Sequence, residues 1–399
     1  MRSLNEPQVN HSCISCIAEV SVQDYARQLM KRPQAKRIPL SGTLELTLRC
    51  NNRCLHCYVN QPAHHEKARE KELAYNEIRR LLDDMAQEGT LWLLLTGGEP
   101  LLREDFRDVY LYAKKKGFLI TLFTNGTLIT PSLVDLLKEF PPRFVEITLY
   151  GVTEGTYEKV TQLPGSYKRC RQGIDLLLKG EIPLKLKTVV MRQNRDEFTA
   201  TKRFVEGLGL EFRFDALLNG SVDGSKDVRR LRISPQQVVE LDLGDPQRHE
   251  AFRSLYERTK GEEADREHLF RCGAGLWSFH IDPYGQLSLC NMARTPSYDL
   301  QNGTFAEGWH EFFPRVREQR QVRDNPCMKC RLINICDQCP GWSQLERSDP
   351  GMPIDYLCQI TRLRAKAFGI GTHSIDGMRL RSPDGEDAAW KAQEQGVNP

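Results

Sequence analysis

The chain has 399 residues and a formal net charge of +3, with acidic and basic residues interleaved. Charge this close to balance does not suggest a protein that binds nucleic acid or another polyanion. The N-terminus lacks an apolar signal core and no apolar run approaches membrane-spanning length, so we expect a cytoplasmic protein with no membrane partner. In a large cytoplasmic chain, 13 cysteines that cluster in the sequence point to metal rather than to disulfides.

Residues 1–40 form a polar N-terminal extension that carries Cys13-Ile14-Ser15-Cys16. A CxxC pair can bind a metal or form a redox disulfide, but two cysteines alone are a weak signal. We therefore interpret Cys13 and Cys16 as surface or packing thiols. The extension is too short to indicate an independent peptide-recognition domain.

The first strong signal is a cysteine motif directly after a strand. The alternating run 43–48 predicts that strand, and Cys50, Cys54 and Cys57 follow it with CxxxCxxC spacing. A structural zinc ion normally takes four ligands as two separated pairs. In an iron–sulfur cube, by contrast, successive cysteines reach different irons, and three cysteines leave one iron open to a small chelating ligand such as an amino acid. Buried packing thiols or a disulfide are the alternative interpretation.

Together with Tyr58, the motif resembles the cluster loop of the radical SAM superfamily, and the resemblance extends from about Thr43 to Cys358. It implies that Cys50, Cys54 and Cys57 hold a [4Fe-4S] cluster whose open iron chelates S-adenosylmethionine. It also implies that an electron from the cluster cleaves the sulfonium, and that the resulting 5′-deoxyadenosyl radical takes hydrogen from a substrate. A reductant such as flavodoxin or ferredoxin would supply the electron.

Strand and helix patterns alternate from Thr43 to about Asp215. The strands are predicted at 43–48, 91–96, 118–123, 144–150, 184–190 and 210–215. This alternation predicts an α/β fold with a parallel sheet and right-handed crossovers. Six units rather than eight predict a partial (β/α)6 TIM-type barrel over residues 41–217, which is the core usual in the radical SAM family.

Unusual residues recur at the C-terminal ends of the predicted strands, where barrel sites gather. The second strand leads into Gly97-Gly98-Glu99-Pro100, which resembles the GGEP motif of the family. Its glycines permit close approach of the backbone and positive φ. The resemblance implies that this segment holds the methionine amino group of S-adenosylmethionine, whereas the segment alone could be only a turn.

Further candidates for the cofactor pocket follow the later strands. Asn125 lies in Thr124-Asn125-Gly126-Thr127, which is either an ordinary turn or a contact to ribose or carboxylate. Thr148 and Lys187 are placed for the same pocket, although either could be a satisfied polar group inside the barrel. Asp215 is a weaker candidate, and Cys170 is predicted to be a buried apolar residue within a helix. No catalytic acid or base is assigned.

The C-terminal part carries a second cysteine array. Residues 218–267 are predicted to form a charged helical bridge, in which Ser234 caps a helix, and residues 366–399 a flexible tail. Between them, residues 268–365 contain Cys272, Cys290, Cys327, Cys330, Cys336, Cys339 and Cys358. Seven cysteines exceed one four-ligand site and fall one short of two, and a pair of zinc sites is the alternative interpretation.

The spacing of this array resembles the SPASM extension, which houses auxiliary iron–sulfur clusters in a subset of radical SAM enzymes. The resemblance implies one or two auxiliary clusters, expected to be [4Fe-4S], and assigns the ligands in two sets. One set is Cys327, Cys330, Cys336 and Cys358; the other is Cys272, Cys290 and Cys339, with a fourth position open or filled by another group. Two residues rather than the usual three separate Cys336 from Cys339, and Asp337 is a possible substitute ligand.

The leading functional hypothesis is an enzyme that modifies a peptide or protein. It would abstract hydrogen and then pass an electron from the substrate radical to an auxiliary cluster. Sulfatase maturases carry an aspartate after a cluster cysteine, whereas here Asn291 follows Cys290, and an amide cannot take up a proton in that role. The alternatives are a small-molecule radical oxidase in tetrapyrrole or cofactor biosynthesis, and a non-catalytic zinc or iron–sulfur scaffold.

Overall fold

A computed structural model of the chain describes residues 36–59, 61–223, 227–321 and 325–370. Cys13, Cys16 and nearly all of the predicted tail lie outside these residues. The chain divides into two compact units. Unit 1 contains the chain up to Ile233 together with Asp265–Asn325 and Cys339–Met352, and unit 2 contains Ser234–Ala264, Pro326–Gln338 and the chain from Pro353 onward. The cysteine-rich region 268–365 is therefore shared between the two units.

Unit 1 is built on a sheet that, within the described residues, has nine strands in the order β11-β10-β9-β1-β4-β5-β6-β7-β8. The strands from β9 to β8 run parallel to one another, whereas β10 is antiparallel to β9 and to β11. Their bounds are β1 Ser41–Glu45, β4 Trp92–Thr96, β5 Leu119–Thr124, β6 Phe144–Thr148, β7 Leu184–Val189, β8 Phe212–Asp215, β9 Ser278–Ile281, β10 Gln286–Ser288 and β11 Tyr298–Asp299. The prediction of an α/β fold with a mainly parallel sheet is confirmed.

The predicted strands agree with the structure except at the first one. Five of them match within two residues at each end, but the strand predicted at 43–48 is found at Ser41–Glu45. Its ladder with β4 ends at the pair Glu45–Thr96, because β4 gives way to Gly97 at that point. The sheet also gains a parallel strand that the six-unit prediction did not include, since β9 from the C-terminal region pairs with β1.

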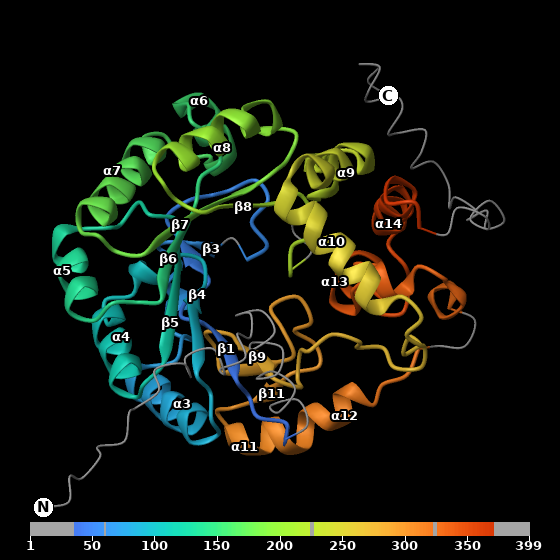
Figure 1. Cartoon of the computed structure of the whole chain (residues 1–399). Coiled ribbons are helices and arrows are strands. Elements are labelled where there is room, and N and C mark those ends of the chain that lie inside the picture. Colours follow the sequence, from blue (N-terminus) through green and yellow to red (C-terminus); the bar gives the residue numbers. More distant parts are fainter. Residues whose placement is uncertain (1–35, 60, 224–226, 322–324, 371–399) are drawn as a thin grey trace, which may run out of the picture. The chain divides into compact units, whose positions relative to one another are not determined.

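Helices cover one face of this sheet, and their apolar sides form the core (Figure 1). They are α3 Tyr75–Gln87, α4 Phe106–Lys115, α5 Pro131–Glu139, α6 Glu154–Thr161, α7 Ser166–Lys179 and α8 Phe198–Gly207. In α3, the buried residues Ile78, Leu81, Leu82 and Met85 recur at helical spacing. Cys170 of α7 is fully buried, as predicted, and burial raises its pKa to about 11.

The two faces of the sheet differ in chemistry because side chains alternate along each strand. Leu44, Leu95 and Ile147 point to the helices and belong to the core. Glu45 of β1 and Glu146 of β6, one residue away from these leucine and isoleucine positions, lie on the opposite face, which we call the polar face. Both glutamates are nevertheless buried, so the polar face must supply partners for their charges.

The remaining elements complete the two units. Unit 1 also has β2 Arg49–Cys50, β3 Gln61–Pro62, α2 Glu66–Arg69, η2 Pro100–Leu102, η3 Arg195–Glu197, η4 Arg229–Leu231, α11 Phe305–Glu307, η5 Gly308–Phe312, α12 Phe313–Arg317 and α13 Pro340–Arg347. Unit 2 has α9 Pro235–Gly244, α10 Pro246–Thr259, η6 Pro326–Lys329, η7 Ile333–Ile335 and α14 Asp355–Ala367. Ser234 caps α9 as predicted. Among the described helices, none has both the length and the apolar character needed to span a bilayer.

Candidate cofactor site

The segment that leads from β1 to the three cysteines is held by the glycine pair after β4. Gly98 donates its backbone N–H to Thr47 (2.7 Å), and Glu99 donates its own to Arg49 (2.9 Å). A Cβ atom on Gly97 would lie 2.1 Å from the Thr47 carbonyl oxygen, and one on Gly98 would lie 2.4 Å from that of Arg49. Only glycine allows this approach. We call the loop that carries Cys50, Cys54 and Cys57 the cysteine loop. One role of the glycine pair is therefore to hold the backbone of residues 47–49, which leads into the cysteine loop.

The other side of the cysteine loop is attached to the C-terminal end of α6. Arg53 donates its backbone N–H to the Thr161 carbonyl (2.9 Å), and Leu55 donates to Val160 (3.0 Å). These bonds also satisfy carbonyls that a helix end leaves without partners. The loop is thus fixed on both sides of Cys54 by backbone contacts that do not depend on a bound group.

The three thiols gather around Tyr150, just after β6. Burial raises the pKa of Tyr150, and the neighbouring Cys54 and Cys57 thiols raise it further. Cys50 is the most buried of the three cysteines; burial raises its pKa to about 12, and the nearby charges of Glu99 and Cys57 contribute to the same shift. Thiols in such a place ionise readily only when a cation binds them. This donor set fits an iron–sulfur cluster.

Asn52, inside the cysteine motif, gives a second test of whether a bound group fits here. Its side chain is only 3% exposed, and within the described part of the chain neither its amide nitrogen nor its amide oxygen has a hydrogen-bond partner. A buried amide left without partners costs about 1–3 kcal/mol. An orphaned polar group beside three thiols is consistent with a site that a cofactor completes.

No three His, Cys, Asp or Glu side chains of the described chain converge as ligands of a single metal ion. A cube differs from a single ion in this respect, because each of its cysteines binds a different iron.

Glu99 is fully buried and anchors the loop after β5. Its Oε1 accepts hydrogen bonds from the Thr124 hydroxyl (2.8 Å) and the Leu101 N–H (3.1 Å), and its Oε2 accepts one from the Asn125 N–H (2.7 Å). Burial raises the pKa of Glu99 to about 7, although these three hydrogen bonds act to lower it. Pro100 follows as the first residue of η2. The role of Glu99 as acceptor for a methionine ammonium group stays a prediction.

Lys187 and Thr148 are neighbours on β7 and β6. The Lys187 ammonium lies 2.6 Å from Glu146 Oε1, and Arg213 Nη2 lies 2.7 Å from the same oxygen. Burial lowers the pKa of Lys187, while Glu146 acts to raise it. The structure therefore gives Lys187 a partner on the polar face, and cofactor binding by Lys187 or Thr148 stays a prediction. Asp215 is exposed and accepts the Leu217 N–H (2.8 Å) in the turn after β8.

A buried ion pair on the polar face, between Glu45 of β1 and Arg294, was not predicted from the sequence. Two Arg294 nitrogens lie 2.8 and 2.7 Å from the two Glu45 oxygens. His280 Nε2 of β9 is 3.2 Å from Glu45, and the Tyr58 hydroxyl donates to Glu45 at 3.4 Å. Burial alone would raise the pKa of Glu45, but His280 and Arg294 lower it to about 2. The alternation of the run 43–48 could have identified Glu45, whereas Arg294 has no comparable sequence signal.

The C-terminal cysteines in unit 1 are Cys272, Cys290 and Cys339. Cys290 Sγ accepts the Ala293 N–H at 3.3 Å. Cys339 is the residue directly before α13; burial raises its pKa, and the nearby Cys290 and Cys272 thiols contribute to the same shift. A Cβ on Gly341 would lie 2.8 Å from the Ala293 nitrogen, so glycine lets the start of α13 reach the segment after Cys290. These three thiols therefore lie together.

The C-terminal cysteines in unit 2 form another set. Burial raises the pKa of Cys358 to about 12, and the thiols of Cys336 and Cys327 lie close enough to contribute. Gln338 donates to Cys358 Sγ at 3.3 Å, and Thr361 donates to Cys336 Sγ at 3.3 Å. Cys330 donates its backbone N–H to the Cys327 carbonyl. The role of both sets as cluster ligands stays a prediction.

Asp337, the possible substitute ligand, pairs with Arg364 of α14. Its carboxylate belongs to unit 2, whereas Cys272, Cys290 and Cys339 belong to unit 1.

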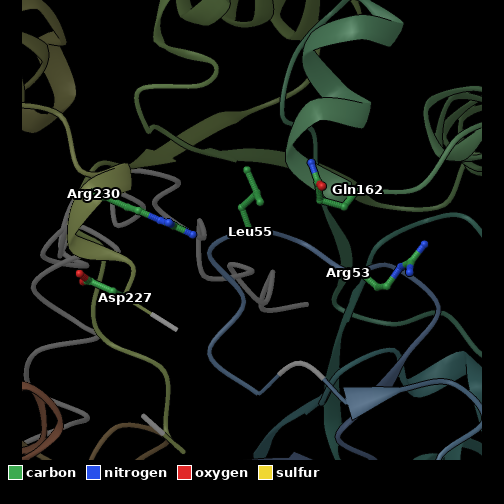
Figure 2. A pocket seen from close by; sticks show the side chains of 5 residues that line it. All are labelled: Arg53, Leu55, Gln162, Asp227 and Arg230. Carbon is green, nitrogen blue, oxygen red and sulfur yellow. The ribbon is translucent and has the colours of Figure 1, made fainter. Parts of the chain in front are cut away.

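A hollow of about 380 Å³ lies beside the cysteine loop, on unit 1 (Figure 2). Its lining residues are Arg53, Leu55, Gln162, Asp227 and Arg230. Arg53 and Leu55 are the two neighbours of Cys54 in the sequence. The residues next to Cys54 are therefore reachable from the outside of the molecule.

Comparison with known proteins identifies the core. Residues 44–205 match the family model of the radical SAM superfamily. The chain contains a radical SAM domain. This domain implies S-adenosylmethionine and a [4Fe-4S] cluster as cofactors, and the predicted resemblance to the radical SAM superfamily is confirmed. The chain is thus an enzyme, and the alternative of a non-catalytic scaffold is set aside. The role of Cys50, Cys54 and Cys57 as ligands of that cluster stays a prediction.

The similarity of this radical SAM enzyme to its relatives covers more of the chain than the radical SAM domain alone. It is 26% identical to the AdoMet-dependent heme synthase of Methanosarcina barkeri, over 74% of this chain and 89% of that protein. It is 25% identical to the mycofactocin maturase MftC of Mycolicibacterium smegmatis, over 84% of this chain and 86% of MftC.

Among solved structures, SuiB of Streptococcus suis bound to the precursor peptide SuiA matches with a TM-score of 0.61 and 16% identity, covering 90% of this chain and 85% of SuiB. At this identity the likeness shows a shared fold. The relatives thus include SPASM-type peptide maturases as well as a heme synthase, and the substrate class differs among them.

Proposed function

We propose that the enzyme takes a hydrogen atom from a peptide or protein and oxidises the resulting radical, and so carries out a post-translational modification. The observation that carries this proposal is the presence of two further sets of thiols, Cys272/Cys290/Cys339 and Cys327/Cys330/Cys336/Cys358, in addition to the cysteine loop. Hydrogen abstraction leaves an unpaired electron on the substrate, and a desaturation or a new bond requires that this electron be removed. One or two auxiliary [4Fe-4S] clusters held by these thiols would accept it.

In the radical SAM domain, Cys50, Cys54 and Cys57 would bind the [4Fe-4S] cluster. When bound, the cluster and S-adenosylmethionine supply the 5′-deoxyadenosyl radical. Gly97, Gly98 and Pro100 shape the loop beside these cysteines, and Glu99 would accept the methionine ammonium group. Tyr58, Asn125, Thr148 and Lys187 would line the remainder of the pocket. We further propose that the parallel sheet curves into a partial (β/α)6 barrel with the polar face inside.

Support for a peptide substrate comes from relatives. MftC is named a maturase, and SuiB was solved with its precursor peptide. The similarity to MftC covers 84% of this chain and 86% of MftC, so it extends well beyond the radical SAM domain. We propose flavodoxin or ferredoxin as the reductant.

A tetrapyrrole substrate is the second candidate, and a specific observation favours it. The heme synthase of Methanosarcina barkeri matches over 89% of its own length at an identity similar to that of MftC. Both candidates use the same initial hydrogen abstraction, and they differ only in the molecule that the polar face would accommodate.

The test is anaerobic reconstitution followed by assays of cleavage and of product. Three cubes would give about twelve iron atoms per chain, and a single cube about four. With a strong reductant, the enzyme should convert S-adenosylmethionine to 5′-deoxyadenosine.

Incubation with candidate precursor peptides and, separately, with an iron tetrapyrrole then identifies the substrate by mass. A mass change in the tetrapyrrole alone would overturn the peptide assignment. A loaded enzyme that never forms 5′-deoxyadenosine would overturn the whole proposal.

A further inference from the structure

We infer that Asn125 is a positioning residue for the cluster: its amide holds the Cys50 sulfur and raises the reduction potential of the cluster that Cys50 binds. The inference rests on the proposed role of Cys50 as a cluster ligand. It differs from the predicted contact between Asn125 and S-adenosylmethionine, because it assigns the amide N–H to a sulfur of the protein.

The amide of Asn125 lies between two segments of the chain. Its Nδ2 is 2.7 Å from Asn51 Oδ1 and 3.7 Å from Cys50 Sγ, and both contacts meet the distance expected for a hydrogen bond to that element. An amide nitrogen carries two hydrogens. One can therefore point to Asn51 and the other to the cysteine sulfur.

The contacts close into a ring. Asn125 donates to Asn51, Asn51 Nδ2 donates to the Thr127 hydroxyl (2.7 Å), and this hydroxyl donates to Asn125 Oδ1 (2.6 Å). Every group in the ring gives one hydrogen and accepts one, so the three bonds strengthen one another. The ring ties the loop after β5 to the cysteine loop.

The ring also fixes which way the amide of Asn125 faces. Asn125 Oδ1 accepts a second hydrogen bond, from the backbone N–H of Thr127 at 2.9 Å. A backbone N–H can only donate, so the oxygen of the amide must face Thr127 and the nitrogen must face Cys50. The main chain of Asn125 is held as well, because its N–H donates to the buried carboxylate of Glu99 (2.7 Å).

Burial of Cys50 strengthens the hydrogen bond that its sulfur accepts from Asn125. Cys50 is only 7% exposed and also accepts the Asn52 N–H at 3.4 Å. In such surroundings, a hydrogen bond to a charged sulfur is stronger than it would be in water. Donors on a cluster sulfur stabilise the reduced state more than the oxidised state, because the reduced state carries one more negative charge. Loss of the Asn125 donor should therefore lower the reduction potential.

The experiment compares Asn125→Ala with the matched variant Thr127→Val in the reconstituted full-length enzyme without S-adenosylmethionine. The midpoint potential is measured by a redox titration followed by EPR of the reduced cluster. Asn125→Ala should reduce the ratio of reduced to oxidised cluster at a given potential by about tenfold, which equals a fall of 59 mV for one electron. Thr127→Val leaves in place the side-chain N–H of Asn125 that faces Cys50 and the backbone N–H of Thr127 that orients this amide. The midpoint potential of this variant should therefore change much less.

The outcomes are decisive in either direction. An unchanged potential in Asn125→Ala would overturn the inference, and so would equal shifts in the two variants. If Asn125→Ala alone fails to load a cluster, the amide is needed to place Cys50, as inferred; if both variants fail alike, the ring is only structural and the inference is wrong. A wild-type enzyme that loads no [4Fe-4S] cluster would instead overturn the proposed function, before any variant is compared.

Discussion

The two cysteine-rich regions of this enzyme are built in different ways. In the radical SAM domain, Cys50, Cys54 and Cys57 lie on one short loop, which backbone hydrogen bonds from two neighbouring segments hold in place. In the C-terminal part, the thiols come from distant positions and are divided between two compact units. The first region is specified by spacing within the motif, whereas the second depends on tertiary contacts such as that of Gly341 with Ala293. The difference explains why only the first region can be identified from a short stretch of sequence.

The largest effect is expected from removing one thiol of each region. Cys54→Ala should abolish formation of 5′-deoxyadenosine, because only two thiols would remain for the cube. Cys336→Ala, in unit 2, should retain cleavage of S-adenosylmethionine but lose the oxidised product. Both are followed by chromatography of 5′-deoxyadenosine and by mass spectrometry of the substrate. Equal loss of cleavage in the two variants would contradict a division of roles between the regions.

A backbone change next to the cysteine loop should have the next largest effect. Gly98→Ala places a methyl group 2.4 Å from the carbonyl oxygen of Arg49, so the loop must shift and cluster loading should fall severely. Gly155→Ala in α6 is the matched control, because nothing lies within 4 Å of its new methyl group. The control should gain about 0.5–1 kcal/mol of stability, as expected for glycine to alanine within a helix. Iron content and thermal unfolding measure the two effects.

Within unit 1, an ion pair between Glu45 and Arg294 joins the radical SAM domain to the C-terminal part. Breaking this pair should lower the free energy of unfolding by several kcal/mol. Glu45→Gln leaves the guanidinium of Arg294 without its charge partner; the side chains are 0% and 13% exposed. Removing one member of a buried pair costs about 3–5 kcal/mol in unfolding free energy. The double variant Glu45→Gln with Arg294→Met should recover part of this loss in denaturant unfolding. An additive loss in the double variant would show that the two residues do not act as a pair.

The same pair predicts a pH dependence. The pKa of Glu45 is lowered from 4.5 to about 2 in the folded protein. A carboxylate with a depressed pKa contributes stability above its unfolded pKa, and that contribution is lost as the pH falls toward the folded value. The stability difference between wild type and Glu45→Gln should therefore shrink between about pH 5 and pH 2. A difference that stays constant over this range would contradict the assigned charge.

The smallest effect is expected from a substitution of Asn52. Its effect on stability should differ between the cluster-free and the cluster-loaded enzyme. Asn52→Leu removes an unpaired buried amide, so the cluster-free protein should gain about 1–3 kcal/mol of stability. The cluster-loaded protein should gain less stability or lose some, because the wild-type amide would hydrogen-bond to the bound group and leucine cannot. Equal gains in both forms, measured by chemical unfolding under anaerobic conditions, would show that Asn52 makes no contact with the cofactor.

Several features could be predicted from the sequence because they depend on near neighbours. The alternation of strand and helix patterns placed five of the six core strands within two residues, and the spacing of Cys50, Cys54 and Cys57 indicated the cluster loop. The glycine pair at Gly97 and Gly98 was recognised, but its close packing against Thr47 and Arg49 was not. A sequence motif gives the residue types at a site but not the backbone that they contact.

The sequence by itself determined the parallel sheet, the cysteine loop and the presence of additional thiols, because hydrophobic period and short spacing are local properties of a chain. Tertiary structure alone decided that β9 joins β1, that Arg294 neutralises Glu45, and that Asn125 faces the sulfur of Cys50. These pairs bring together residues that are 75 to 249 positions apart. Burial and hydrogen-bond direction select such partners, and neither is fixed until the chain has folded.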